Sequence, residues 1–323
     1  MKASSQTNRI SFVNKLKLFC LIILLSSTSS LLAKVEKISY RGWKNCYQIS
    51  NALSKVIIVP ESGGRVLAFT YKDKNIIYQD SSQNGKSYED WKKVYFDPDG
   101  GRLDYGSEKE TNPIHNLTWM GYWKVKSVGE YSITIYSEKD SLLGMFSERT
   151  FTLDKRSAKL TTLQTATNIS KQVLTRHFWS RTLVQPGGEL VINLNRNSRF
   201  KSGWGRFVFD PDSIVEDDRD ARINIKGYRL LFNSKGTTYK FGADLKKGVI
   251  DYYYKGLKFQ KKYRIGDLDQ YVGSDDMNTI FYHSPKFLEI EPTSETINLL
   301  PGQKMSFKEV WSLSAKSKPC TSH

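Results

Sequence analysis

FLEIEPTSETINLLPGQKMSFKEVWSL (Phe287–Leu313) holds the features that decide the fold class of this chain. It begins with an alternating pattern that places Phe287, Glu289 and Glu291 on one face of a strand and the intervening apolar residues on the other. A Pro-Gly turn then delivers a second alternating run, MSFKEVWSL. Short runs with a period of two, joined by turn residues, are typical of antiparallel β-structure. The two carboxylates either face water or line a cavity.

The same period recurs along most of the chain. Runs rich in Val, Ile, Tyr or Phe and bounded by turn residues occupy 45–51, 55–60, 65–72, 75–80, 131–137, 147–153 and 159–168. The stretch 236–264 reads as three strands joined by Lys-Gly turns, a meander. Almost no helix is expected after the first 33 residues. We therefore predict an all-β fold, a large two-sheet antiparallel sandwich that forms a single domain over 34–315 and is followed by a tail at 316–323.

The first 33 residues have the layout of a secretory signal peptide. Lys15 and Lys17 precede the apolar run LFCLIILL, and a small-residue stretch follows and ends at Ala33. The apolar run is too short to span a membrane, and no later run is long enough. We expect cleavage after Ala33 and a secreted or periplasmic mature protein without a membrane span.

The amount and distribution of charge indicate which classes of binding partner to expect. The chain of 323 residues has a formal net charge of +16, and the leader contributes four basic residues to it and no acidic ones. Lys and Arg are spread along the chain rather than clustered, and no nucleic-acid-binding motif is present, so we expect no nucleic-acid partner. A basic surface suits an acidic glycan, and simple solubility explains the same charge equally well.

The mature chain keeps two cysteines, Cys46 and Cys320, one near each end. In an oxidising compartment they form either a disulfide or two free thiols. The repeated Asp-Pro-Asp phrase at 97–99 and 210–212 offers calcium ligands, but it lacks the remaining positions of an EF-hand loop and is first of all a turn-former. No Cys/His spacing suits zinc. We expect no metal and no cofactor.

His177 is the histidine with the most suggestive neighbours. It lies in TRHFWSRT, where a strand places Trp179 and Arg181 on the same face as His177. A lone His on a strand is more often structural than catalytic. A proton donor, a flat apolar surface and a cationic hydrogen-bond donor are nevertheless the grouping that a sugar site uses.

Two stretches resemble paired strands of the aldose 1-epimerases. ATNIS…TRHFW is similar to a "tNxt" element followed by "nHxYFNL", and LEIEPTSETINLLPGQ is similar to "xLExq…LxPGexy". The opening region, through GGRVLAFTYK, resembles the "GGrixsf" element of the same family. As a whole the pattern comes closest to an uncharacterised group of secreted bacterial proteins with the galactose-mutarotase-like fold. The resemblance covers most of the mature chain and implies the supersandwich of that fold.

The resemblance places His177 on the acid of the family and Glu291 on its base. In that mechanism Glu291 takes the proton of the anomeric hydroxyl while His177 protonates the ring oxygen. The "NRI" and "lHGG" elements of the family are absent, and DPDGGRLDYG (97–106) offers Arg102 and Asp104 in their place. One of the two histidines of a mutarotase site therefore has no equivalent here.

Two functions are consistent with these residues. The first is an enzyme, most simply an aldose 1-epimerase, and the second is a glycan-binding protein that keeps the concave cleft without the acid–base pair. A hydrolase is a distant third, because Glu291 and Asp104 are its only carboxylate pair. We expect Glu291 to line the cleft and Glu289 to face water. The residues expected to bind the sugar are Arg65, Arg102, Asp104, Trp179 and Arg181.

Overall fold

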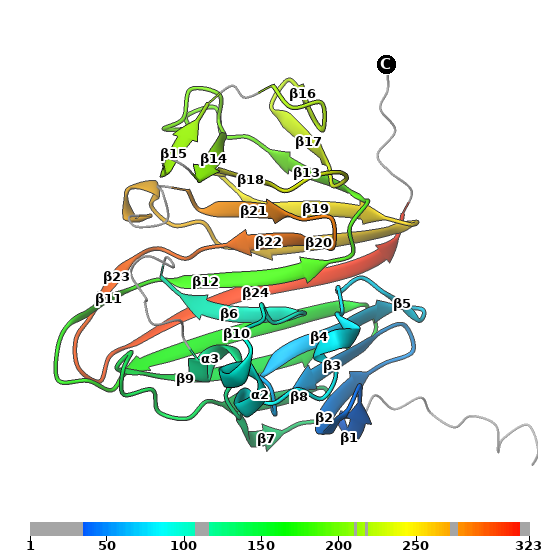
Figure 1. Ribbon diagram of the computed structural model, residues 1–323, viewed down its shortest axis with the longest axis vertical. Coiled ribbons are helices and arrows are strands. Elements are labelled where there is room, and N and C mark those ends of the chain that lie inside the picture. The colour runs from blue at the N-terminus through cyan, green and yellow to red at the C-terminus, as the bar shows by residue number, and fades with distance from the viewer. Residues whose placement is uncertain (1–34, 107–115, 210–211, 217–218, 272–276, 317–323) are drawn as a thin grey trace, which may run out of the picture. The chain divides into compact units, whose positions relative to one another are not determined.

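A computed structural model of the chain describes residues 35–106, 116–209, 212–216, 219–271 and 277–316 (Figure 1). The predicted leader and Cys320 lie outside the described residues, so the cleavage site and the disulfide stay predictions. Cys46 is buried. No helix within the described ranges is both long and apolar enough to cross a membrane.

Two large antiparallel sheets make up the described part of the chain (Figure 1). The larger sheet runs in the order β1 (Val35–Tyr40), β2 (Trp43–Ser50), β3 (Lys55–Val59), β4 (Arg65–Tyr71), β6 (Gly101–Tyr105), β12 (Phe178–Val184), β22 (Leu288–Pro292), β21 (Thr279–His283), β18 (Tyr239–Ala243), β14 (Gly205–Phe209) and β15 (Asp212–Val215), with β5 (Lys74–Asn75) paired to β4. The smaller sheet runs in the order β16 (Ile223–Lys226), β17 (Arg229–Asn233), β13 (Glu189–Asn193), β19 (Gly248–Tyr254), β20 (Leu257–Tyr263), β24 (Lys304–Ala315), β10 (Lys159–Asn168), β9 (Met145–Leu153), β8 (Ser132–Tyr136) and β7 (Lys124–Val128). β11 (Leu174–Arg176) and β23 (Ile297–Leu299) form a separate pair. The predicted all-β, two-sheet fold is confirmed.

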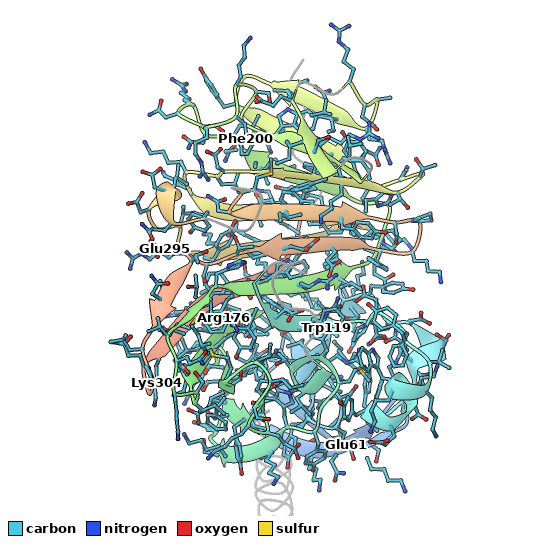
Figure 2. All side chains as sticks on the ribbon, turned by 60° about the vertical axis from the view of Figure 1, so that its left-hand side comes forward. Glu61, Trp119, Arg176, Phe200, Glu295 and Lys304 are labelled. Carbon is cyan, nitrogen blue, oxygen red and sulfur yellow. The ribbon has the colours of Figure 1, made fainter. Side chains whose placement is uncertain are left out.

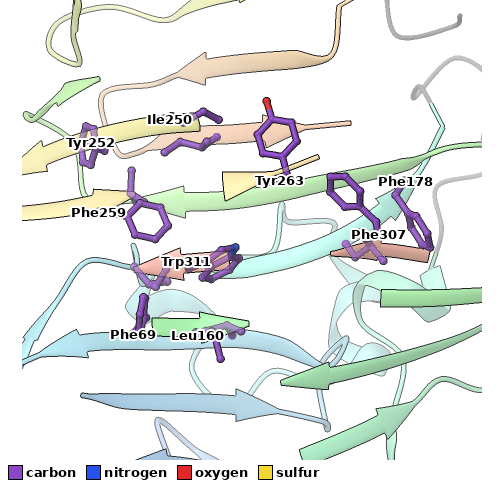
Figure 3. Close-up of a cluster of buried hydrophobic side chains, with 14 of the residues drawn as sticks. Phe69, Leu160, Phe178, Ile250, Tyr252, Phe259, Tyr263, Phe307 and Trp311 are labelled. Atoms are coloured by element: carbon purple, nitrogen blue, oxygen red, sulfur yellow. The ribbon is translucent and has the colours of Figure 1, made fainter. Parts of the chain in front are cut away.

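The core lies between the two sheets and follows from the alternation along each strand. Leu288 and Ile290 of β22 are fully buried in it, while the carboxylates between and after them point to the other face. Aromatic rings from both sheets meet in the core (Figure 3). The ring of Trp311 lies 5.9 Å from that of Phe259 and 6.5 Å from that of Phe69. Full burial of each large apolar side chain contributes roughly 1.5–3 kcal/mol.

The predicted meander at 236–264 is correct in its three strands and wrong in their pairing. β18 joins the larger sheet through β14 and β21, whereas β19 and β20 pair with each other in the smaller sheet. The chain crosses between the sheets at Leu245. Asn278 holds that crossing by bonding the backbone N–H and C=O of Leu245, each at 2.9 Å.

Short helices precede and follow β6 on the chain. α2 (Tyr88–Lys93) begins with a capping box, in which Ser87 and Asp90 each accept from the other's backbone N–H. Trp91 of α2 packs against Trp119 of α3 (Asn116–Trp119). Two 3₁₀ turns, Ser81–Gln83 and Leu268–Gln270, complete the helical content of the described residues, which agrees with the expectation of almost no helix.

Candidate functional site

Charged and aromatic side chains form a row on the outer face of the larger sheet, the face turned away from the core. On β12, Phe178 is buried in the core, so the alternation turns Trp179 and Arg181 to the outer face. Arg102 of β6 lies opposite Arg181, and Tyr282 of β21 lies opposite Glu289 of β22. Four neighbouring strands thus bring residues from distant parts of the sequence onto one surface.

A cavity of about 340 Å³ opens on this surface. It is lined by Tyr95, Asp97, Trp179, Arg181, Lys240, Tyr282, Phe287, Glu289 and Glu291. Its volume lies at the lower end of the range for small-molecule sites, roughly 300–1,000 Å³. Aromatic rings and a small set of charged groups converge in it, which is the composition of a site for a small polar ligand.

Glu291 is the most unusual group in the cavity. Its Oε2 accepts the indole N–H of Trp179 at 2.7 Å, and its buried Oε1 has no hydrogen-bond partner among the described residues. Burial, and then the neighbouring Glu289, raise the pKa of Glu291 to about 7, against the opposing effect of Arg181. A carboxyl group that is half protonated near neutral pH can both accept and donate a proton.

Glu289 is buried beside it, with 1% of its surface exposed. Arg181 donates to it through Nε at 2.7 Å and Nη2 at 3.1 Å, and a nitrogen of Arg102 lies 3.5 Å away. The expectation that Glu289 faces water is therefore wrong. The physical reason is that two guanidinium groups compensate its charge, which makes burial tolerable.

The segment after α2 is held down by two buried arginines. Arg102 donates to the backbone oxygen of Pro98 and to Asp97 at 2.5 Å, and Arg65 donates to the Asp99 carboxylate at 2.9 Å. Arg65 and Arg102 were expected around the sugar, but neither is among the described residues that line the cavity. Both arginines contribute to the site indirectly, because they fix the segment that carries Asp97.

The Asp-Pro-Asp phrase at 97–99 thus pairs with arginines. Among the described residues, no group of three or more His, Cys, Asp or Glu side chains could hold a metal ion. The second copy of the phrase, at 210–212, falls partly outside those residues.

Trp119, labelled in Figure 2, connects the arginines of this region. Its ring lies 4.9 Å from the guanidinium of Arg102 and 5.2 Å from that of Arg181, and its indole N–H donates to Asp104. Cations over indole rings gain about 0.5–2 kcal/mol each. Asp104 therefore orients Trp119, and it does not belong to the described lining of the cavity either.

His177 lies between β11 and β12, so the predicted continuous strand is broken at this residue. Its Nδ1 is 3.3 Å from the hydroxyl of Thr296. Burial, and then Arg176, lower the pKa of His177 to about 4, which leaves the imidazole neutral at neutral pH. His177 is not among the described residues that line the cavity with Glu291. Of the residues expected in the cleft, the structure brings together Glu291, Trp179 and Arg181.

Four residues that line the cavity were not identified as site residues from the sequence: Tyr95, Lys240, Tyr282 and Phe287. The alternation of 287–291 already places Phe287 on the face of the two carboxylates. Lys240 and Tyr282 depend on strand pairing. β21 lies beside β22, and Lys240 of β18 lies directly opposite Tyr282.

No protein-family model matches the sequence, and no curated protein matches it either. Among solved structures, the chain is similar to a candidate aldose 1-epimerase from Escherichia coli K12, with a TM-score of 0.58 and 12% identity over 84% of this chain and 99% of that one. It is also similar to a protein from Synechocystis sp. PCC 6803 (TM-score 0.61, 11% identity, 87% and 100% covered). A galactose mutarotase-like protein from Lactobacillus casei ATCC 334 gives a TM-score of 0.58 at 10% identity, with 84% and 100% covered. At these identities the likeness shows the galactose-mutarotase-like fold.

Proposed function

We propose that the cavity binds a sugar ring and that Glu291 exchanges a proton with that ring, as in an aldose 1-epimerase. The observation that carries this proposal is the state of Glu291. Its carboxyl group is buried at the cavity, one oxygen is held by Trp179 and the other has no hydrogen bond among the described residues. An unpaired buried acceptor costs about 1–3 kcal/mol. A sugar hydroxyl that donates to this oxygen would remove that cost.

The proposed step begins when the carboxylate of Glu291 accepts the proton of the anomeric hydroxyl. The electron pair of that O–H bond forms the carbonyl, the bond between the anomeric carbon and the ring oxygen breaks, and the ring oxygen takes up a proton. We assign the supply of that proton to Tyr282, because it lines the same cavity. A phenol is protonated at neutral pH, and burial raises the pKa of Tyr282 further. Ring closure on the other face of the carbonyl returns both protons.

The charges of the lining favour a neutral sugar. Three carboxyl groups and two cations line the cavity, and one of the cations, Arg181, is already bonded to Glu289. An acidic sugar would place a further negative charge beside these carboxyl groups. The acidic glycan that the basic composition suggested is therefore the less favoured ligand for this cavity.

A non-catalytic glycan-binding protein is the second candidate. The observation that favours it is that His177, the acid implied by the family resemblance, lies outside the described lining. Polarimetry on freshly dissolved α-anomers of neutral aldoses, together with calorimetric binding of the same sugars, separates the two. The enzyme predicts that the wild type accelerates equilibration, that Glu291→Gln abolishes the acceleration but still binds, and that Tyr282→Phe slows it.

The results have clear readings. Binding without acceleration in the wild type supports the second candidate. Absence of both, over a panel of hexoses and pentoses, contradicts the proposal.

We also propose that the protein is exported. The support is the leader layout of the first 33 residues. N-terminal sequencing of protein recovered from the periplasm or the medium tests the proposal, with Lys34 as the expected first residue.

A further inference from the structure

Aromatic rings continue beyond the cavity on the side of the segment that follows α2. Tyr95 lines the cavity and is 57% exposed. Its ring lies 5.6 Å from that of Trp91, at 63°, and Trp91 stacks on Tyr88 at 6.3 Å. Trp91 is itself buried and donates its indole N–H to the backbone of Phe96 at 2.9 Å. Tyr95 is therefore an exposed ring on a fixed support.

A second set of rings continues from the lining at the turn between β21 and β22. Phe287 lies between Tyr282, at 6.1 Å, and Tyr78, at 5.4 Å. Tyr282 and Phe287 line the cavity, and Tyr78 lies outside the lining. All three side chains are half-buried, so each shows part of its ring to solvent.

Tyr95 and Tyr282 lie on different sides of the cavity floor, whereas Tyr78 lies beside the C-terminal end of β12, where its backbone N–H donates to Leu183 at 2.9 Å. Asp97, two residues after Tyr95, bonds Arg102 of β6, whereas Tyr282 belongs to β21. β12 and β22, which carry Arg181 and Glu291, lie between β6 and β21 in the sheet. Three inter-strand spacings separate β6 from β21, roughly 14 Å, which is wider than one sugar ring.

We infer that aromatic rings at the edge of the cavity form outer subsites, and that the ligand is a neutral oligosaccharide with one ring in the cavity beside Tyr282 and further rings on Tyr95 and on the Phe287–Tyr78 pair. This inference rests on the proposed sugar site and extends it to the substrate class. A pyranose presents apolar C–H faces and polar edges, so its faces pack on aromatic rings while its hydroxyls stay in water. Rings that are already held in place lose little conformational freedom when a ligand stacks on them.

Continuity with the cavity favours a glycan chain over a protein partner. Tyr95, Tyr282 and Phe287 each line the cavity, so a ligand on these rings is in contact with the sugar at Glu291. Charged groups are mixed with the rings, as at Lys92, whose Nζ lies 4.8 Å from the ring of Tyr88. Rings mixed with charged groups suit a glycan, whereas the core of a protein interface is depleted of charged residues.

Calorimetry with glucose, cellobiose and cellotetraose, and with the matching galactose and mannose series, tests the inference. The readout is the ratio of the affinity for the tetrasaccharide to that for the monosaccharide. We expect a ratio of about ten or more for the wild type in at least one series. Tyr95→Ala and Tyr78→Ala should each bring that ratio down to within about threefold of unity.

A matched control is Tyr228→Ala, because Tyr228 is similarly exposed (49%) but lies on the turn between β16 and β17 of the smaller sheet. It should leave the ratio unchanged. If monosaccharides bind but the ratio is near unity in every series, the inference fails while the proposed function stands. A ratio that rises only for oligogalacturonates, used as an acidic comparison, also overturns it. Absence of binding by any sugar contradicts the proposed function itself.

Discussion

Replacing Glu291 by Gln should raise the free energy of unfolding above that of the wild type at alkaline pH, and the difference should grow as the pH rises through neutrality. Glutamine keeps the shape of the side chain and an acceptor oxygen for the indole of Trp179, and it removes the charge. Burial and then Glu289 raise the pKa of Glu291 from 4.5 to about 7 in the folded protein. Between these two pH values the folded state holds a proton that the unfolded state has released. The stability of the wild type therefore falls as pH rises through this window, and it levels off above it.

The size of the effect follows from the same two values. Each pH unit inside the window removes about 1.4 kcal/mol, so the whole window is worth about 3 kcal/mol. The unpaired amide N–H of glutamine costs on the order of 1 kcal/mol, but it does so equally at every pH. The readout is therefore the change with pH of the difference in unfolding free energy between variant and wild type.

Urea unfolding at pH 5 and pH 8 measures this quantity. We expect the difference to shift in favour of Glu291→Gln by about 2–3 kcal/mol between the two pH values. Glu130→Gln is the matched control, because Glu130 is exposed and forms a solvent-exposed ion pair with Lys155 at 2.8 Å. Its effect should stay within about 0.5 kcal/mol and be independent of pH. A difference for Glu291→Gln that does not change with pH would refute the reasoning, since the carboxyl would then not titrate near neutrality.

Three further perturbations have defined outcomes. Trp179→Phe removes the hydrogen bond that lowers the pKa of Glu291, so that pKa, followed by NMR, should rise, and a fall would contradict the assignment. Lys261→Met breaks the fully buried ion pair with Glu309 and should lower the free energy of unfolding in urea by roughly 3–5 kcal/mol. The double variant Lys261→Met/Glu309→Leu should recover most of that loss, because it leaves no unpaired charge buried. An equal loss in the single and the double variant would contradict this interpretation of the ion pair. Burial, and then Glu61, raise the pKa of Cys46 to about 12. In mature protein that carries Cys320→Ser, the remaining thiol should therefore react with Ellman's reagent at pH 8 only after unfolding, and rapid reaction of this variant in its native state would contradict the burial of Cys46.

The fold class was predictable from the sequence because the signal is local. The alternation at 287–291 alone places Leu288 and Ile290 in the core and the two carboxylates on the other face, as observed. The sheet that each strand joins is not a local property. At 236–264 all strands share one period, and the crossing at Leu245 depends on Asn278, more than 30 positions later in the chain.

The site was predictable where the family resemblance and the strand alternation agree. Glu291, Trp179 and Arg181 line the same cavity, although their roles in binding and catalysis remain predictions. Glu289 could not be placed, because its burial depends on guanidinium groups supplied by β6 and β12. His177 could not be placed either, since the strand is interrupted between β11 and β12 at this residue and the sequence there contains no Gly or Pro that would indicate a break.

The central claim is that Glu291 is a proton-exchanging group in contact with a bound sugar. The most direct measurement is a pH titration of the side-chain carboxyl carbons by NMR, on protein labelled at glutamate, with and without a saturating neutral sugar. The account predicts one signal with a midpoint near pH 7 that is missing in Glu291→Gln and whose midpoint moves when the sugar is added. If no glutamate titrates above about pH 6, or if the signal of Glu291 is the same with and without every sugar that binds, the claim is contradicted.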